Sequence, residues 1–430
     1  MYREILEKLV CWKDNKNRSI LFLDGGKGVG KTYTLKDFGE GCFDYTVAVD
    51  LKKQDYIRVF LEEKPNKERF LNILEIACGG RMTAGQTLIV LENPEELSNV
   101  KEVIRFLYDN MKEFHIVLTS SLREKIFMDR LHEASELIQV MHLYPLNIKE
   151  FLNILGKEEL TEKIKNSGKK SLSDEDKALL DKYIRLYFYV GGMPSVVQRY
   201  IDTKSLKEVA DEKKRLLDNF ENEINQIEYK ALSDKVMKVW KSIDAQLNKE
   251  NKKFQFGVVK LTARAREYND AVEWLYSNKY MDKVYRAKEP LSKLCEHRDE
   301  KSYEVYLTDI GILTEMYNIS YKELCEAKDL SELKCGALTE QFVYQELTSN
   351  ENIKDIYYWT SDATAKVEFM FEDNNEVIPI EINLCENTKA QSIKVYKSRY
   401  NPAMYITISK DNMSMLKGAI RLPIYAIWNL

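Results

Sequence analysis

Eight consecutive residues near the start of the chain carry its strongest chemical signal. They follow the pattern G-x-x-x-x-G-K-T and are Gly25, Gly26, Lys27, Gly28, Val29, Gly30, Lys31 and Thr32. Glycines at this spacing let the backbone turn successive N–H groups into one concavity, which can hold a triphosphate at the N-terminus of the next helix. We expect Lys31 to reach the outer phosphates and Thr32 to bind Mg²⁺. This interpretation, an ATP site, is favoured over a glycine-rich surface turn.

A second candidate site directly follows the apolar run 87–91. This short continuous run is typical of a buried parallel strand, and Glu92 and Asn93 come next. A carboxylate at this position can hold Mg²⁺ through water, and its neighbour usually orients the attacking water in phosphoryl transfer. An amide orients water but cannot accept its proton. Asn93 therefore predicts slow hydrolysis, unless Glu95 or Glu96 accepts the proton instead. The alternative to a metal-binding site is that residues 92–96 form the solvent-exposed start of a helix.

Alternating strands and helices must position these groups. We expect strands at residues 19–23, 45–50, 87–91, 115–119 and 139–143, and helices at 33–38, 67–76 and 101–114. Such alternation predicts a parallel sheet covered by helices on both faces. Gly25, Glu92 and Thr119 then lie at the carboxyl ends of strands, where nucleotides bind in sheets of this kind.

Composition limits the classes of function. A chain of 430 residues predicts two to four domains, and a net charge of −4 gives no overall attraction to nucleic acid or to an anionic membrane. No run of 18 apolar residues and no signal peptide are present, so we expect a cytoplasmic protein without a membrane partner. The seven scattered cysteines form no C-x-x-C pair and are expected to be buried, reduced thiols.

Several later segments carry a family resemblance. The segments are Leu143 to Leu152, Tyr189 to Val197, Trp274-Leu275, Tyr306 to Leu313, Gly336 to Val343 and Pro379 to Ile382. With the glycine-rich loop, they resemble prokaryotic AAA-like P-loop ATPases that carry a C-terminal domain of unknown function with a restriction-endonuclease-like, PD-(D/E)XK core. The resemblance covers nearly the whole chain.

The resemblance implies roles for further residues. Thr119 and Ser121 are similar to the segment that senses the outer phosphate. Gly192-Met193-Pro194 resembles the turn by which a helical lid touches the nucleotide, so Gly192 and Pro194 join the expected binding residues. The family usually has an Asp-Glu pair where this chain has Glu92-Asn93, so the resemblance implies nucleotide binding more directly than hydrolysis.

The expected fold class is α/β and multidomain. Its parts are a P-loop ATPase core at residues 1–155, a helical lid at 156–230, a winged helix-turn-helix at 231–320 and a nuclease-like α/β domain at 321–430. Within the third part, helices are expected at 234–247, 257–264 and 268–277 and strands at 281–286 and 303–307. Residues 156–173 are expected to form an exposed connection.

A basic segment in the third part is a candidate DNA contact. From Lys249 to Arg266 the winged-helix region has a local excess of positive charge that can contact phosphates. The expected recognition helix, however, presents Asn269, Asp270 and Glu273, and acidic groups repel a phosphate backbone. A packing module beside the ATPase is therefore the favoured alternative to DNA binding.

The C-terminal part has the outline of a metal-dependent nuclease. Its candidate metal ligands are Glu340, Glu368 and Glu381, because such sites need carboxylates on a helix and two neighbouring strands. Asn383 stands where an E-x-K motif requires lysine. We therefore expect a retained sheet without nuclease activity.

These observations predict an ATP-binding protein that acts as a nucleotide-dependent switch with weak or slow, Mg²⁺-dependent hydrolysis. Two alternatives remain: an ATP-regulated DNA-processing nuclease, and a non-catalytic protein that binds a protein partner and keeps nucleotide as a structural element. The sequence names neither the partner nor the oligomeric state.

Overall fold

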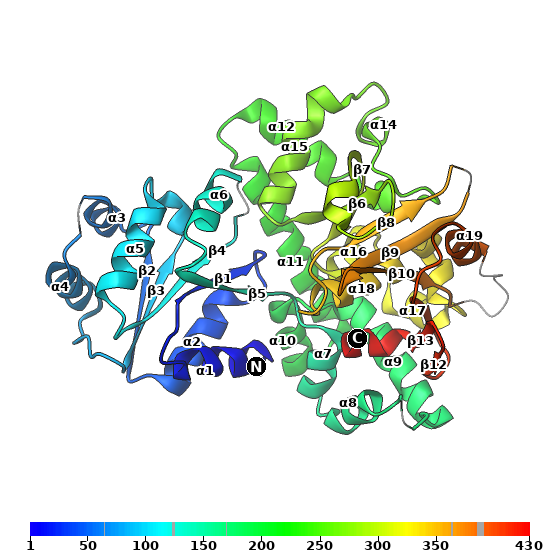
Figure 1. The fold of residues 1–430 in the computed structure, drawn as a ribbon, viewed down its shortest axis with the longest axis horizontal. Coiled ribbons are helices and arrows are strands. Elements are labelled where there is room, and N and C mark those ends of the chain that lie inside the picture. Colours follow the sequence, from blue (N-terminus) through cyan, green and yellow to red (C-terminus); the bar gives the residue numbers. More distant parts are fainter. Residues whose placement is uncertain (64, 123–124, 169, 363, 385–390) are drawn as a thin grey trace. The chain divides into compact units, whose positions relative to one another are not determined.

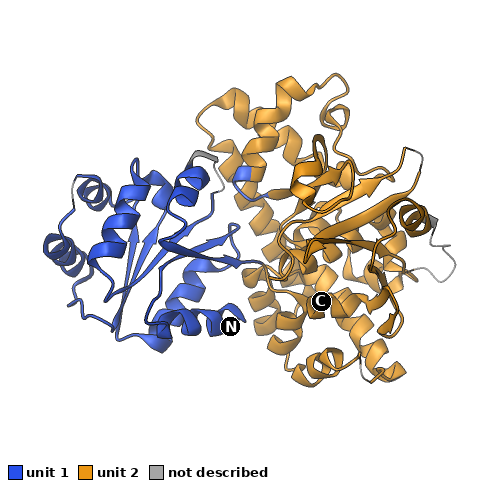
Figure 2. Cartoon of the chain, viewed as in Figure 1, with its two compact units in different colours: residues 1–144, 277–280 blue, residues 145–276, 281–430 orange. Residues whose placement is uncertain are grey.

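The structure, a computed structural model, describes residues 1–430 except 64, 123–124, 169, 363 and 385–390. The chain forms two compact units (Figure 2). Unit 1 comprises residues 1–144 and 277–280, and unit 2 comprises residues 145–276 and 281–430. The sequence-based division into four domains stays a prediction.

Unit 1 contains a five-stranded parallel sheet (Figure 1). Its strands are β1 (Ile20–Gly25), β2 (Tyr45–Asp50), β3 (Thr87–Glu92), β4 (His115–Ser120) and β5 (Ile138–Leu143). Their order is β2-β3-β4-β1-β5, and every pair is parallel. The predicted parallel sheet is therefore confirmed, because continuous apolar runs are what a sheet covered on both faces requires.

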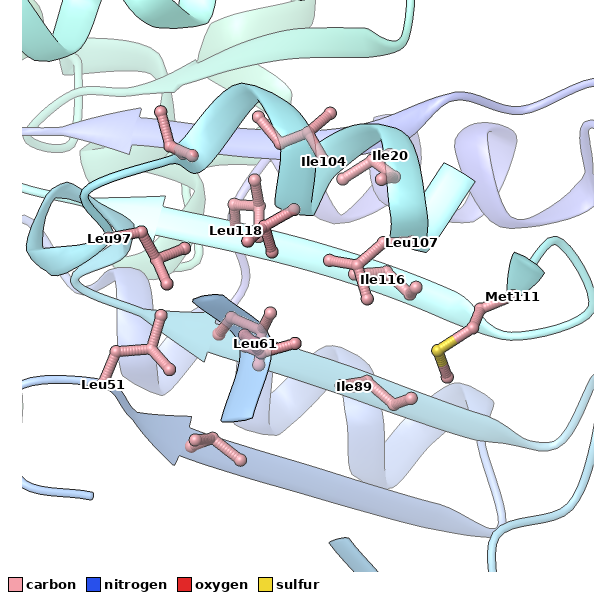
Figure 3. Close-up of a cluster of buried hydrophobic side chains, with 14 of the residues drawn as sticks. Ile20, Leu51, Leu61, Ile89, Leu97, Ile104, Leu107, Met111, Ile116 and Leu118 are labelled. Carbon is pink, nitrogen blue, oxygen red and sulfur yellow. The ribbon is translucent and has the colours of Figure 1, made fainter. Parts of the chain in front are cut away.

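Helices cover both faces of this sheet. They are α1 (Ile5–Asp14), α2 (Lys31–Cys42), α3 (Asp55–Glu62), α4 (Lys67–Cys78), the 3₁₀ turn η1 (Pro94–Glu96), α5 (Val100–Asn110) and α6 (Lys125–Glu133). One core joins α1 and α2 to the sheet, and a second joins α3, α4 and α5 to it. In the second core, Ile104 and Leu107 of α5 lie over Ile116 and Leu118 of β4 (Figure 3).

Unit 2 begins with a run of helices. They are α7 (Ile148–Ile154), α8 (Glu158–Lys165), α9 (Asp174–Val190), α10 (Pro194–Thr203), α11 (Leu206–Asn225), α12 (Lys230–Trp240), α13 (Ile243–Leu247), α14 (Phe256–Val259) and α15 (Ala265–Ser277). The expected exposed connection at 156–173 is wrong in part, because α8 lies within it and buries Leu160 and Ile164. Lysine and glutamate on the outer face of α8 obscured this amphipathic pattern.

The predicted winged-helix segment differs from expectation in detail. The single helix expected at 234–247 is two helices, because α12 ends at Trp240 and the Ser242 side chain bonds back to the Val239 carbonyl. The helix expected at 257–264 is only the short α14. The winged-helix assignment stays a prediction.

The rest of unit 2 is built on an eight-stranded mixed sheet. Its strands are β6 (Met281–Ala287), β7 (Arg298–Leu307), β8 (Tyr357–Thr360), β9 (Lys366–Asp373), β10 (Glu376–Ile382), β11 (Tyr405–Ser409), β12 (Ser414–Leu416) and β13 (Ala419–Pro423). The order is β12-β13-β11-β10-β9-β8-β6-β7. Strand β6 pairs antiparallel with β7 and parallel with β8, so one sheet runs through the segments that the sequence assigned to two domains.

The remaining elements of unit 2 follow or flank this sheet. They are η2 (Leu294–His297), α16 (Ile310–Met316), α17 (Tyr321–Glu326), η3 (Leu330–Gly336), α18 (Ala337–Thr348), α19 (Gln391–Tyr400) and η4 (Ile424–Asn429). Helix α18 is buried along most of its length, which brings its polar side chains into the interior of the unit. Two of these, Gln341 and Gln345, bond to backbone groups at the end of β7 and the start of α16.

Candidate functional site: the glycine-rich loop and its neighbours

The glycine-rich loop leaves the carboxyl end of β1, and α2 begins at its Lys31. Gly28 and Gly30 have φ values of 79° and 95°, which glycine adopts without steric cost. A Cβ atom on Gly25 would lie 2.5 Å from the Leu143 carbonyl oxygen, so a side chain there is excluded. The loop thus has the tight turn and close backbone approach that phosphate binding requires.

Lys31 folds back over this loop. Its Nζ donates to the carbonyl oxygens of Gly25 at 2.8 Å and Gly26 at 2.9 Å, and to Ser121 Oγ at 2.7 Å. Burial lowers the pKa of Lys31 to about 8, although the charges of Glu95 and Glu92 oppose this shift. A bound phosphate would replace neutral acceptors with charged ones and would raise this pKa.

Thr32 and Glu92 come together from different elements. The Thr32 hydroxyl, in the first turn of α2, donates to Glu92 Oε1 at the end of β3 over 3.2 Å. A hydroxyl and a carboxylate are hard oxygen ligands of the kind that Mg²⁺ takes beside substrate phosphates. The donor set therefore fits the magnesium ion predicted for these two residues.

Asn93 contacts a carboxylate that the sequence analysis did not identify. Its Nδ2 donates to Asp50 Oδ1 at 2.7 Å, and its backbone N–H donates to the Thr119 carbonyl at 3.0 Å. Asp50 ends β2 and lies opposite Glu92 in the sheet. The signal was present, since the predicted strand at 45–50 ends in Asp50, but the sequence did not establish that this strand borders β3.

Asp50 is held ionised. Burial alone would raise its pKa, but hydrogen bonds from Lys53, Asn93 and the Lys52 backbone N–H together lower it. Lys53 Nζ lies 2.9 Å from Asp50 Oδ2. A negative charge is therefore fixed beside Asn93 at neutral pH.

Of the two glutamates considered as substitutes for Asn93, only Glu95 is enclosed. Burial raises the pKa of the Glu95 carboxyl, while a hydrogen bond from Ser120 opposes the rise, and its Oε2 is buried without a hydrogen-bond partner. Glu96 is exposed. Glu95 thus lies near the loop lysine, in a site where burial raises the pKa of its carboxyl.

The two residues of the predicted phosphate sensor occupy different environments. Thr119 is buried, and its hydroxyl donates to the Leu23 carbonyl at 3.0 Å, between β4 and β1. Ser121 instead contacts Lys31. In this structure Ser121 is the member of the pair that faces the loop.

A buried carboxylate precedes the loop. Asp24 is 2% exposed, accepts a hydrogen bond from His142 Nδ1 at 3.0 Å and forms an ion pair with Lys279. Lys279 belongs to the four-residue segment that unit 1 takes from late in the chain. The sequence analysis missed both partners because they are more than a hundred residues from Asp24.

The predicted lid turn lies in unit 2. Gly192 donates its N–H to Asp309 Oδ2 at 2.6 Å and accepts from the Leu146 N–H at 2.8 Å. A Cβ on Gly192 would lie 2.1 Å from the Leu146 carbonyl oxygen, and Pro194 begins α10. Within its own unit, this turn is tightly held, and its approach to nucleotide stays a prediction.

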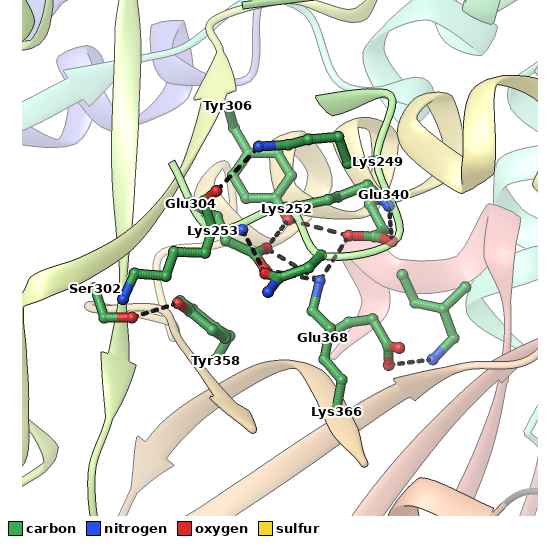
Figure 4. Close-up of polar contacts among 12 residues, drawn as sticks. Lys249, Lys252, Lys253, Ser302, Glu304, Tyr306, Glu340, Tyr358, Lys366 and Glu368 are labelled. Atoms are coloured by element: carbon green, nitrogen blue, oxygen red, sulfur yellow. Dashed lines mark hydrogen bonds and ion pairs between the residues drawn. The ribbon is translucent and has the colours of Figure 1, made fainter. Parts of the chain in front are cut away.

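In unit 2, lysines pair with Glu340, one of the three carboxylates of the expected nuclease site, and with the neighbouring Glu304 (Figure 4). Lys252 Nζ lies 2.7 Å from Glu340 Oε1, and Lys366 Nζ lies 2.9 Å from Glu304 and 3.2 Å from Glu340. The Tyr306 hydroxyl donates to Glu304 at 2.9 Å and lies 3.3 Å from Glu340. We refer to Lys252, Glu304, Tyr306, Glu340 and Lys366 as the lysine–glutamate cluster.

Charge pairing favours the ionised forms of Lys366 and Glu340. Burial alone would lower the pKa of Lys366, but Glu304 and Glu340 raise it above its ordinary value. Burial alone would raise the pKa of Glu340, but Lys366 and Lys252 lower it. Two ammonium groups therefore occupy positions that metal ions would need beside Glu340.

The other two predicted metal ligands, Glu368 and Glu381, accept hydrogen bonds from backbone N–H groups. Glu368 accepts from the Ile382 N–H at 3.2 Å, and burial raises its pKa to about 8. Glu381 accepts from the Ile393 N–H at 3.3 Å. Among the residues that the structure describes, no group of three or more histidine, cysteine or acidic residues is placed to hold a metal ion, so metal binding by Glu340, Glu368 and Glu381 is not supported.

The basic segment from Lys249 to Arg266 exposes less positive charge than its sequence suggests. Lys252 is 3% exposed and belongs to the lysine–glutamate cluster, and Lys249 bonds to Gln246 at 2.9 Å. Lys253, Lys260, Arg264 and Arg266 remain exposed. The basic surface that this segment can offer to DNA is therefore smaller than its sequence suggests, since Lys252 is buried, and DNA contact through Lys249 to Arg266 stays a prediction.

Predictions from composition have mixed outcomes. No helix in the described ranges is long and apolar enough to cross a membrane. The expectation of buried thiols is wrong for four cysteines, Cys11, Cys295, Cys325 and Cys335, which are exposed. Cys42 and Cys78 are half-buried free thiols, and Cys385 lies outside the described residues.

Three family models match successive parts of the chain. Residues 17–152 match an AAA domain, residues 181–323 match a domain of unknown function (DUF8612), and residues 335–427 match another (DUF4143). With the loop geometry, the first match identifies an AAA-like P-loop ATPase domain. The resemblance is confirmed to that extent, and the restriction-endonuclease-like core stays a prediction.

Solved structures are similar at low identity. They include the Walker-type ATPase PABY2304 of Pyrococcus abyssi, at 12% identity and a TM-score of 0.44 over 73% of this chain and 95% of that one. A single-residue variant of Thermotoga maritima RuvB has 14% identity and a TM-score of 0.30 over 66% and 90%, and C. elegans PCH-2 has 12% and 0.28 over 50% and 68%. No curated protein matches the chain.

Proposed function

We propose that unit 1 binds ATP with Mg²⁺ and hydrolyses it slowly, and that the nucleotide acts as a switch for the rest of the chain. The observation that carries this proposal is the convergence of Lys31, Thr32 and Glu92 at one glycine-rich loop. The loop amides and the first turn of α2 supply donors for the phosphates. Lys31 supplies a positive charge already positioned at the loop.

Thr32 and Glu92 would hold the magnesium ion, which when bound offsets the negative charge of the phosphates. Lys31 must exchange its bonds to the Gly25 and Gly26 carbonyls for bonds to phosphate. Because charge-assisted hydrogen bonds are stronger than neutral ones, this exchange favours nucleotide binding. Slow turnover follows from Asn93, which cannot accept a proton from water.

Lys31→Ala tests the binding site. We expect ATP affinity, measured by titration of a fluorescent ATP analogue, to fall by about a hundredfold, since a charge-assisted hydrogen bond contributes ~1.5–3 kcal/mol and Lys31 can form more than one. The matched control is Lys36→Ala on the same helix, where the lysine is 72% exposed and pairs with Glu40 at 3.7 Å. Micromolar affinity in a folded Lys31→Ala protein would refute the ATP site.

The switch is tested with the same proteins. Hydrogen exchange of the wild type with and without Mg-ATP should change in α9, α10 and α11 of unit 2 as well as in the loop, and Lys31→Ala should abolish both changes. Changes confined to unit 1 would leave nucleotide binding in place but refute the switch.

The nuclease alternative is disfavoured. Its helix carboxylate, Glu340, is already paired with two lysines, so a divalent ion would have to displace them. A nuclease also needs a lysine in the position of Asn383, and Lys366 is committed to Glu304 and Glu340.

A further inference from the structure

Resting on the proposed ATPase activity, we propose that Asp50 and Asn93 form the pair that orients the attacking water, with Asp50 as a positioning residue that acts through Asn93. The pair joins the ends of two adjacent strands, β2 and β3, at the edge of the sheet from which the glycine-rich loop also emerges. It lies one residue beyond Glu92, which contacts Thr32. The place of the expected proton acceptor is thus held by an amide with a carboxylate behind it.

The hydrogen bond fixes which way the Asn93 amide faces. An ionised carboxylate only accepts hydrogen bonds, so the 2.7 Å contact to Asp50 Oδ1 requires the donor, Nδ2, on that side. The acceptor Oδ1 then points away from Asp50, and within the described part of the chain it accepts no hydrogen bond. Its free lone pairs are available to a water molecule.

The Asn93 backbone is equally constrained. Its φ of 57° places it in the left-handed region, which asparagine tolerates better than most residues. Its N–H donates to the Thr119 carbonyl at 3.0 Å, which ties it to β4. Asn93 is therefore held at both the main chain and the side chain, as a residue that orients a reactant must be.

The negative charge of Asp50 is maintained by its own partners. Its Oδ2 pairs with Lys53 at 2.9 Å, and its Oδ1 also accepts the Lys52 N–H at 3.0 Å. A fixed charge behind the amide polarises it, so that Asn93 Oδ1 becomes a stronger acceptor for a water proton. This arrangement compensates in part for the missing carboxylate at residue 93.

The chemical step balances without a protein base. The water oxygen forms a bond to the γ-phosphorus as the bond from that phosphorus to the bridging oxygen of ADP breaks, and the electron pair leaves with ADP. Asn93 Oδ1 accepts a hydrogen bond from the water, and both water protons leave with the inorganic phosphate. Orientation without proton transfer is consistent with slow turnover.

Asp50→Asn removes the negative charge at residue 50. The two amides at residues 50 and 93 can then bond in either direction, so the orientation of the Asn93 side chain is no longer fixed. We expect phosphate release to fall about tenfold or more, with ATP affinity within twofold of the wild type. The matched control is Asp55→Asn, whose carboxylate is 75% exposed and pairs with Arg58 on α3. This control should leave both quantities unchanged.

The exchange variant Asp50→Asn with Asn93→Asp separates orientation from a merely structural role. It restores an amide–carboxylate bond with reversed direction and places a carboxylate beside the water, so turnover should return to or exceed that of the wild type. Wild-type turnover in Asp50→Asn, or failure of the exchange variant to recover activity while ATP is still bound, overturns the pair. Absence of ATP binding by the wild type overturns the proposed function instead, and the inference with it.

Discussion

Removing the central lysine of the lysine–glutamate cluster should strongly destabilise unit 2. Lys366 is 18% exposed and pairs at 2.9 Å with Glu304, which is 1% exposed, and at 3.2 Å with Glu340, which is 12% exposed. In Lys366→Met, Glu340 keeps Lys252, but Glu304 loses its ion pair and keeps the hydrogen bond from the Tyr306 hydroxyl and the weaker attraction of Lys249. Removing one partner of a buried ion pair costs about 3–5 kcal/mol, because the other charge is left without compensation. We expect a loss in this range.

The measurement is urea unfolding followed by tryptophan fluorescence. Four of the five tryptophans report on unit 2, namely Trp240, Trp274, Trp359 and Trp428. The matched control is Lys322→Met, since Lys322 is 81% exposed and its 3.6 Å pair with Glu326 is worth at most ~1 kcal/mol.

Adding Glu304→Gln to Lys366→Met tests the cause of the loss. The double variant removes the orphaned charge, so it should recover at least half of the lost free energy of unfolding. A Lys366→Met protein no less stable than Lys322→Met, or no recovery in the double variant, would refute the view that charge pairing holds the cluster together.

Two further predictions concern metal and pH. Thr32→Val removes the hydroxyl beside Glu92 and should weaken ATP binding about tenfold in Mg²⁺ but not in excess chelator; equal weakening in both solutions would contradict a metal role. Glu368 has a folded pKa of about 8 against an ordinary 4.5, so the folded state retains a proton that the unfolded state releases between these values. The free energy of unfolding of the wild type should therefore fall as pH rises through this window. In urea unfolding, the stability of Glu368→Gln relative to the wild type should increase with pH by at most about 1.4 kcal/mol per pH unit. A stability difference between the two proteins that stays constant from pH 5 to 8 would contradict the raised pKa.

Local sequence patterns predicted the ATPase sheet well. The strand at 45–50 has the bounds that were expected, and β3 and β4 extend the runs expected at 87–91 and 115–119 by one residue each, because short apolar runs are local signals. The glycine-rich loop was equally clear, since its spacing is dictated by the backbone turn. Thr32 and Glu92 were expected at one metal, and the structure brings them within 3.2 Å.

Pairings between distant residues were not predictable in the same way. Asp50 contacts Asn93 only because β2 borders β3, and the sequences of the two strands do not determine the order of strands in the sheet. Lys252 was counted in a candidate DNA-contact segment because lysine is usually solvated, yet it pairs with Glu340, 88 residues away. A buried charge looks like a surface charge in sequence when its partner comes from another element.

The pairing of β6 with β8 affects how this protein can be divided for study. Tyr285 and Arg286 lie opposite Tyr357 and Tyr358, so the backbone of β8 takes β6 as its neighbour. The matched ranges 181–323 and 335–427 separate these two strands. Either fragment made alone would present an unpaired strand edge to solvent, which is a template for aggregation. A fragment intended for expression should therefore keep both strands, even though the family boundaries suggest a cut between them.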